Sequence, residues 1–79
     1  MVVTLYTRSG CCLCDDVKKA IVEARRQAEF EYREIDIDAD PRLRRLYNDE
    51  VPVVEIDGRR AFRYRMTSSE LLKELAARA

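Results

Sequence analysis

The chain has 79 residues, 47% of them hydrophobic, so its length and composition suit one small globular domain over residues 1–79. Fifteen basic and fifteen acidic residues give a net charge of zero, so overall charge favours neither a nucleic acid nor an anionic membrane as partner. The lack of histidine removes the commonest general base and a common metal ligand.

The sequence contains no apolar run that approaches the roughly 20 residues of a membrane-spanning helix. Residues 1–6 lack the basic and long apolar regions of a signal peptide and instead suit a strand. We therefore expect a cytoplasmic protein without a membrane partner. In that compartment structural disulfides are rare, and closely spaced cysteines are more often redox-active or metal-binding.

The first third of the sequence predicts a strand, a turn and a helix. Residues 2–6 form a short apolar run rich in β-branched side chains, which is typical of a buried strand. Residues 7–10 are mostly polar, and we expect Ser9 or Gly10 to cap the helix that follows. Between residues 11 and 28 apolar side chains recur at steps of three and four, which indicates one buried helix face.

The middle of the sequence predicts a second strand over residues 30–37 and then a short helix. Asp40 suits the N-cap of that helix and Pro41 its first position. Its apolar residues stop before residues 48–49, where we expect the helix to end.

The last third predicts a hairpin followed by a helix. Residues 53–56 and 60–64 suit two strands joined at Asp57-Gly58, a dipeptide typical of two-residue hairpin turns. Residues 67–70, Thr-Ser-Ser-Glu, form a capping box that opens the last helix. The order β-α-β-α-β-β-α implies parallel first strands with a right-handed crossover and an antiparallel hairpin, so we expect an α/β fold with a mixed sheet.

All three cysteines, Cys11, Cys12 and Cys14, lie where the strand pattern gives way to the helix pattern. Cys-x-x-Cys at a helix start places the second sulfur about one turn beyond the first, so a disulfide can form with little backbone movement. The positive end of the helix dipole favours a thiolate at the first position, and Arg8 adds a positive charge upstream. This pattern indicates that Cys11 attacks and Cys14 resolves; two buried structural thiols are the alternative.

Cys12 has two interpretations. It is either a second resolving or regulatory thiol, or a residue that only fills its position and is not needed for turnover. In an exposed position it would make the protein prone to dimerise through a disulfide. The three thiolates lack a fourth cysteine or a histidine, so a zinc site would need Asp15 or a second subunit, and we expect no metal site.

Three motifs resemble the glutaredoxin family of the thioredoxin fold. Residues 6–14, Tyr-Thr-Arg-Ser-Gly-Cys-Cys-Leu-Cys, resemble the glutaredoxin run Tyr-Thr-Lys-x-x-Cys-Pro-Tyr-Cys. Val51-Pro52 resembles the Val-Pro whose proline is cis in that family, and residues 53–58 resemble the hairpin that follows it. The resemblance spans nearly the whole chain and implies a thioredoxin-like fold, with a four-stranded mixed sheet and helices on both faces.

The resemblance also implies a thiol–disulfide oxidoreductase that reduces protein disulfides or glutathione mixed disulfides, with a reductase or glutathione as electron donor. We expect a monomer without a tightly bound cofactor. A cis bond at Pro52 would expose the Val51 N–H and C=O for pairing with an extended substrate beside Cys11. A non-catalytic binding module and a glutathione-dependent iron–sulfur carrier are the alternatives. Beside catalytic Cys11 and Cys14, the residues expected to bind substrate are Arg8, Cys12, Leu13, Val51, Pro52 and Arg65.

Arginines after the predicted hairpin form a local concentration of charge. Strand alternation would place Arg63 and Arg65 on one face, where they would bind glutathione carboxylates or an acidic partner. The alternative is a solvated edge strand that its charges protect against aggregation.

Two departures from the glutaredoxin pattern bear on the electron donor. The dipeptide Cys12-Leu13 replaces the Pro-Tyr of the family, which predicts a less rigid turn. Glutaredoxins carry Gly-Gly after the hairpin to hold the γ-glutamyl end of glutathione, whereas this chain has no glycine after Gly58. The chain therefore resembles a divergent branch, in which the choice between glutathione and a reductase stays open.

Overall fold

The computed structural model describes residues 1–48 and 50–78, and its elements follow the predicted order β-α-β-α-β-β-α. A short 3₁₀ turn adds one element that the sequence pattern does not predict. In chain order they are β1 (Val2–Thr7), α1 (Cys12–Arg25), β2 (Glu31–Asp36), the 3₁₀ turn η1 (Ile37–Ala39), α2 (Pro41–Tyr47), β3 (Val53–Ile56), β4 (Arg59–Arg63) and α3 (Ser68–Arg78).

The four strands form one mixed sheet in the order β2-β1-β3-β4, which confirms the expected fold class. Strand β1 runs parallel to β2 and antiparallel to β3, and β4 runs antiparallel to β3. The register places Tyr6 opposite Val53, and Val53 opposite Arg63. The carboxyl ends of β1, β2 and β4 therefore lie at the same end of the sheet as the amino end of β3.

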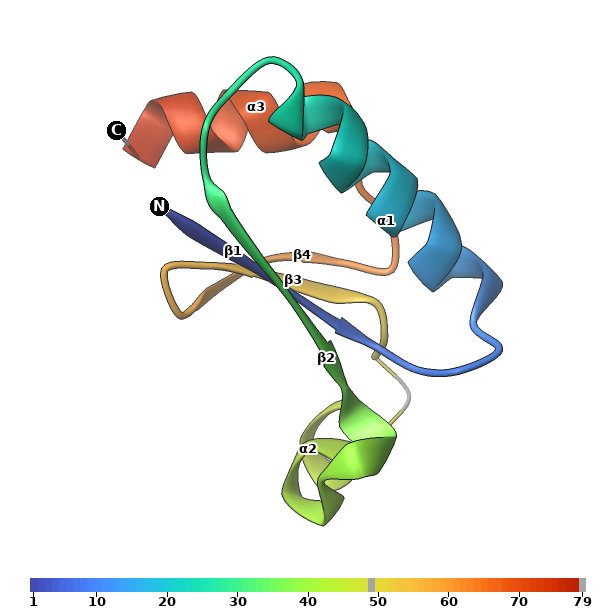
Figure 1. Ribbon diagram of the computed structural model, residues 1–79. Coiled ribbons are helices and arrows are strands. Elements are labelled where there is room, and N and C mark those ends of the chain that lie inside the picture. Colours follow the sequence, from blue (N-terminus) through green and yellow to red (C-terminus); the bar gives the residue numbers. More distant parts are fainter. Residues whose placement is uncertain (49, 79) are drawn as a thin grey trace.

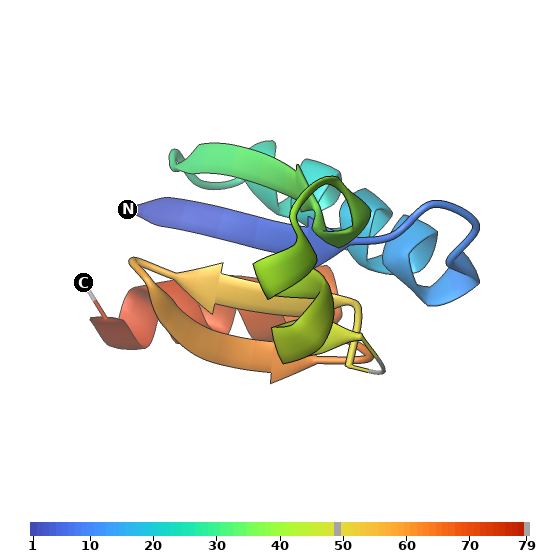
Figure 2. The same cartoon turned by 90° about the horizontal axis from the view of Figure 1, so that it is seen from below.

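Helices cover both faces of this sheet, as predicted. Figures 1 and 2 show α1 and α3 on one face and α2 on the other. Neighbouring Val53 and Val54 belong to different apolar clusters, because successive side chains of a strand point to opposite faces. The cluster under α1 and α3 consists of Val3, Leu5, Val17, Ile21, Ala24, Phe30, Val54, Ile56, Met66, Leu71 and Leu75.

The cluster under α2 is smaller and consists of Ile37, Tyr47 and Val53, with Tyr6, Leu43 and Val51 packed around it. The rings of Tyr6 and Tyr47 stack with centroids 4.7 Å apart, and both hydroxyls donate to the Glu55 carboxylate at 3.1 Å. Burial and the Glu55 carboxylate together raise the pKa of Tyr6 to about 12, and the same two causes raise the pKa of Tyr47.

Within the described residues, no helix is long and apolar enough to cross a bilayer.

The hairpin between β3 and β4 turns at Asp57 and Gly58, as the dipeptide predicts. Both residues have positive φ, 51° and 83°, which is the conformation of a two-residue turn that matches the strand twist. A bulge follows, because Val54 pairs with Phe62 while Glu55 pairs with Arg60.

This bulge changes which arginines share a face. Residues three apart in a regular strand point to opposite faces. Here Arg60 and Arg63 both reach the Glu50 carboxylate, at 3.4 and 2.9 Å. The extra residue in β4 therefore brings the two guanidinium groups to one side.

Several element ends differ from the predicted ones by one to three residues. Helix α1 ends at Arg25 rather than residue 28, because the Arg26 and Gln27 N–H groups bond three residues back and tighten its last turn. Strand β2 ends at Asp36, whose carboxylate accepts the Asp38 N–H at 2.8 Å and opens the turn η1. The fourth strand spans Arg59–Arg63 rather than residues 60–64.

Two predicted helix starts are confirmed: the one at Asp40 and Pro41, and the one at the capping box of residues 67–70. Asp40 is the N-cap of α2 and accepts the Arg42 N–H at 2.9 Å, with Pro41 as the first helical residue. In α3 the Thr67 N–H donates to Glu70 Oε1 at 2.9 Å, while the Glu70 N–H donates to Thr67 Oγ1 at 3.1 Å. Helix α2 ends at Tyr47; the predicted end at residues 48–49 falls partly on residue 49, which lies outside the described residues.

Tyr32 in β2 has a buried hydroxyl without a hydrogen-bond partner in the described part of the chain. Its burial is the main cause that raises the pKa of Tyr32 to about 12. A buried polar group without a partner costs about 1–3 kcal/mol of stability.

We therefore expect Tyr32→Phe to raise the free energy of unfolding by about 1 kcal/mol, because it removes an unsatisfied hydroxyl and keeps the ring. Urea-induced unfolding of the reduced protein at pH 7 measures the change. Tyr47→Phe is the matched control: it makes the same chemical change but removes a hydrogen bond to Glu55, so it should lower stability. Equal losses in both variants would contradict the assignment of Tyr32 as unsatisfied.

Candidate active site

The turn between β1 and α1 places the cysteines at the amino end of α1. Gly10 has a φ of +79°, which favours glycine, and the Cys11 N–H then donates to the Arg8 carbonyl at 3.3 Å. Cys11 is itself the N-cap of α1: its backbone is extended, and its Sγ accepts the Cys14 N–H at 3.3 Å. The predicted cap at Ser9 or Gly10 is therefore wrong, because a sulfur takes the acceptor position that a hydroxyl oxygen often has.

The three thiols differ in their exposure. Cys12 is exposed, Cys11 is half-buried and Cys14 is only 2% exposed. Burial is the main cause that raises the pKa of the Cys14 thiol, and the hydrogen bond with Cys11 adds to it, although Thr7 acts in the opposite direction. The two cysteines of the Cys-x-x-Cys motif are therefore unequal: Cys11 is half-buried at the helix end, whereas Cys14 is buried and its thiol has a raised pKa.

The Arg8 side chain forms an ion pair with an acidic residue. Its Nη2 lies 3.0 Å from Asp38 Oδ1, its Nε lies 3.2 Å from Oδ2, and its Nη1 donates to the Asn48 carbonyl at 3.1 Å. Because β1 and β2 pair in parallel to their carboxyl ends, the residues that follow them are neighbours. The hydrogen bond from Arg8 holds the pKa of Asp38 below its usual range. The Arg8 charge that the sequence places upstream of Cys11 is therefore paired with the Asp38 carboxylate.

Val51 and Pro52 precede β3, so the pairing of Tyr6 with Val53 sets them at the end of the sheet that carries the thiols. The Val51–Pro52 peptide bond is cis. Pro52 is buried, and its carbonyl accepts the Tyr64 N–H at 2.8 Å. Among the described residues, neither the N–H nor the C=O of Val51 has a hydrogen-bond partner.

A groove of about 400 Å³ lies between the first turns of α1 and the segment that joins β4 to α3. Leu13 and Tyr64 contribute exposed apolar surface, at 38% and 41% exposure. The groove also includes Arg65, so the structure brings together two of the predicted substrate-binding residues, Leu13 and Arg65. Its lining residues are Leu13, Asp16, Val17, Tyr64, Arg65, Met66, Thr67 and Glu70.

The expected common face of Arg63 and Arg65 is wrong. Strand β4 ends at Arg63, Tyr64 has a φ of 70°, and the Arg65 N–H donates to the Arg63 carbonyl at 2.8 Å in a tight turn. Strand alternation therefore stops before Arg65. The guanidinium of Arg63 binds Glu50, whereas that of Arg65 has no ion pair within residues 1–48 and 50–78.

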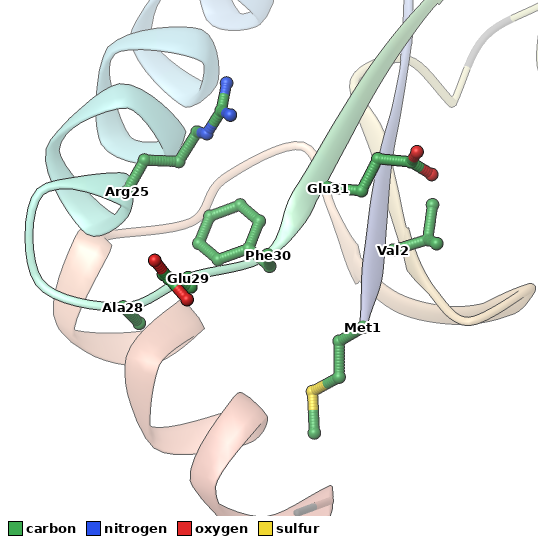
Figure 3. Close-up of a pocket in the computed structure, with 7 residues that line it drawn as sticks. All are labelled: Met1, Val2, Arg25, Ala28, Glu29, Phe30 and Glu31. Carbon is green, nitrogen blue, oxygen red and sulfur yellow. The ribbon is translucent and has the colours of Figure 1, made fainter.

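Another cavity, of about 620 Å³, lies at the opposite end of the sheet, beside the start of β1 and the end of α1. Figure 3 shows the Phe30 ring between α1 and the start of β2, with Met1 nearby. Its charged lining side chains are Arg25, Glu29 and Glu31. The cavity contains no thiol, so it contributes nothing to the chemistry of the cysteines.

The described residues include no group of three or more histidine, cysteine or acidic side chains placed to hold a metal ion. Among the three cysteines, Cys12 is exposed while Cys14 lies in the interior.

Sequence patterns do not reveal two parts of this site. Asp38 pairs with Arg8 only because the parallel strands end together, and the sequence signal for that is the βαβ order. Asp16 and Glu70 line the groove from different helices, and no local pattern connects them.

Comparison with known proteins finds relatives that match along most of this chain. The model of a family described as Glutaredoxin-like domain (DUF836) matches residues 2–76. The uncharacterized protein Rv0508 of Mycobacterium tuberculosis is 32% identical, in a match that covers 94% of this chain and 81% of that protein.

Solved structures show the same fold. The X-ray structure of target protein XcR50 from X. campestris is 31% identical, covers 95% of this chain and 96% of that chain, and has a TM-score of 0.80. The solution structure of Ne2328 from Nitrosomonas europaea is 30% identical over 91% of this chain and 87% of that chain, with a TM-score of 0.75. Thioredoxin 1 from Thermosipho africanus is similar in fold alone, at 17% identity over 99% and 93% of the two chains and a TM-score of 0.72.

We expect the reduced protein to lose stability as the pH rises above about 8.5, the ordinary pKa of a thiol. The pKa of folded Cys14 is raised, so above that pH the folded chain holds a proton that the unfolded chain has released. The contribution is complete below the unfolded pKa and is lost as the pH rises through the folded pKa.

Urea unfolding at pH 7.5 and pH 9.5 tests this, with Cys14→Ser as the control that does not titrate. Wild type should lose more stability than the variant over this interval, because only the Cys14 contribution differs between the two proteins. Parallel losses would contradict a raised pKa at Cys14.

Proposed function

This chain belongs to the glutaredoxin-like family, and on that premise we propose that it is a thiol–disulfide oxidoreductase that reduces disulfides through Cys11 and Cys14. One observation carries the proposal: the sulfur of half-buried Cys11 accepts a backbone N–H at the amino end of α1, while Cys14 is buried one turn away. Donors at a helix amino end stabilise a thiolate, which is the nucleophile of disulfide exchange.

The proposed reaction has three steps. The Cys11 thiolate attacks one sulfur of a substrate disulfide; a Cys11–substrate disulfide forms, and the other substrate sulfur leaves as a thiolate that takes a proton. Cys14 then loses its proton and attacks Cys11 Sγ, which releases the second substrate thiol and leaves a Cys11–Cys14 disulfide. Two electrons and two protons from glutathione or a reductase restore both thiols.

The buried position of Cys14 suits the second step. A protonated thiol does not compete for the substrate disulfide, so the first attack falls to Cys11. The raised pKa of Cys14 keeps it protonated at neutral pH. Once Cys11 is bound to substrate, its sulfur is the electrophile nearest to Cys14.

Other residues of the site position the substrate and the turn in this proposal. The unpaired N–H and C=O of Val51 offer an extended substrate backbone two hydrogen bonds, in the manner of strand addition. Arg8 is a positioning residue, because it holds the thiol turn against Asp38 and the Asn48 carbonyl. Cys12 lies outside the dithiol pair and is exposed to solvent. The proposal needs no bound cofactor and suits the reducing cytoplasm.

A redox titration in glutathione buffers, with thiols trapped and the species read by mass spectrometry, tests the dithiol. We expect a Cys11–Cys14 disulfide with a midpoint between about −270 and −180 mV, the range of thioredoxins through protein disulfide isomerase. A disulfide that uses Cys12 instead would contradict the assignment of the pair.

Three matched variants test the roles. Cys11→Ser should abolish disulfide reduction, because the attacking sulfur is gone. Cys14→Ser should accumulate a mixed disulfide with substrate, visible by mass, because resolution is blocked. Cys12→Ser is the control and should keep most of the wild-type rate. Reduction that survives Cys11→Ser would refute the mechanism, and the binding-module alternative would then explain the fold.

A further inference from the structure

We propose that the groove beside the thiols selects extended polypeptide disulfides that carry a cationic residue near the cystine, in preference to glutathione disulfides. The inference rests on the proposed function and names the substrate class of the same site. It depends on the position of the groove, its apolar mouth, and the charges that line it.

The groove adjoins the segments that carry the chemical site, although no cysteine lines it. Leu13 lies between Cys12 and Cys14 in the chain and also lines the groove. On the opposite wall, the Tyr64 N–H donates to the carbonyl of Pro52 at 2.8 Å. A polypeptide whose cystine reaches Cys11 would therefore place its neighbouring residues in the groove.

The mouth of the groove is apolar on both sides. Leu13 and Tyr64 are among the most exposed large apolar side chains of the protein, although most apolar side chains of this size lie in the two clusters. The Arg63 guanidinium lies 5.1 Å from the centroid of the Tyr64 ring. Burial of this surface under an apolar or aromatic side chain of the substrate is favourable, and glutathione has no such side chain.

The charges of the groove favour a cationic ligand. Asp16 from α1 and Glu70 from α3 contribute two carboxylates, against the single guanidinium of Arg65. In the residues that the structure describes, neither carboxylate forms a salt bridge. A cation in the groove would meet two carboxylates that no ion pair occupies, whereas an anion would meet two like charges and only one guanidinium.

The amino end of α3 reinforces this preference. A helix amino end can bind an anion through its free N–H groups. Here the Thr67 N–H already donates to the Glu70 carboxylate, and the Glu70 N–H donates to Thr67 Oγ1. A ligand carboxylate at this point would find both of these N–H groups already engaged, and it would lie close to the negatively charged carboxylate of Glu70. The carboxylates of glutathione therefore find little support in this groove.

The test uses peptides of one sequence length, each with a central cysteine in a mixed disulfide with thionitrobenzoate. Pairs of lysine, serine or glutamate flank the cysteine, and glutathione in the same mixed disulfide is the fourth substrate. Attack by reduced protein forms a protein–peptide disulfide and releases the coloured thiolate, so a single turnover needs no reductase. An exposed ion pair changes binding by at most about five-fold, so the lysine peptide should react about five-fold faster than the glutamate peptide at low salt. Glutathione should be the slowest substrate, and added salt should reduce the differences.

Matched variants locate the effect. Asp16→Asn with Glu70→Gln removes both charges, and the glutamine amide can still accept the Thr67 N–H, so α3 keeps its cap. This double variant should lose the preference for lysine. Asp15→Asn is the control, because Asp15 occupies the same turn of α1 but lies outside the groove, and it should keep the preference. Arg65→Gln removes the opposing positive charge and should strengthen the preference for the lysine peptide.

Equal rates for all four substrates, or the fastest reaction with the glutathione substrate, would overturn the inference but leave the oxidoreductase proposal intact. A lysine preference that persists in the double variant would also overturn it. No reaction above that of Cys11→Ser with any substrate would overturn both proposals. Circular dichroism of each variant confirms that the comparison is made on folded protein.

Discussion

The register of the sheet is the constraint on which the rest of the site depends. Strand β1 pairs in parallel with β2 and antiparallel with β3, so the turn after β1, the turn after β2 and the segment before β3 all meet at one end. The thiols, the Arg8–Asp38 pair and Val51–Pro52 occupy those three segments. A slip of one residue between β1 and β3 would exchange the faces of β3 and move Val53 out of its cluster. Core packing therefore fixes the geometry of the thiol end indirectly.

The two faces of the sheet serve different purposes. The face under α1 and α3 buries the larger apolar cluster and supports the helix whose amino end carries the cysteines. On the other face, α2 is held by a small cluster in which the carboxylate of Glu55 binds two tyrosine hydroxyls. Tyr6 belongs to this second face, so it packs away from the helix that carries the thiols. The sheet thus separates the thiols from the polar network of Glu55 and the two tyrosines.

Much of the fold follows from local sequence patterns, and the Tyr32 and Cys14 experiments concern what those patterns leave out. Apolar periodicity, Asp40-Pro41, the Asp57-Gly58 turn and the capping box before α3 predict the elements and their order. Local patterns do not show which distant residues pair, or where the backbone takes an unusual conformation. Arg8 binds Asp38 because two parallel strands end together, and no local pattern shows that. Arg65 leaves the strand because the chain turns at Tyr64, which has positive φ without being glycine.

Cys11 has two tasks, because its sulfur is both the N-cap of α1 and the proposed nucleophile. The amide proton of Cys14 is donated to that sulfur, so it senses whether the sulfur carries charge, a proton or a covalent bond. This amide is therefore a built-in spectroscopic reporter of the oxidation state. The NMR frequency of this amide and its rate of exchange with solvent deuterium belong to a buried residue. Both nevertheless report the chemical state of Cys11 at the amino end of α1.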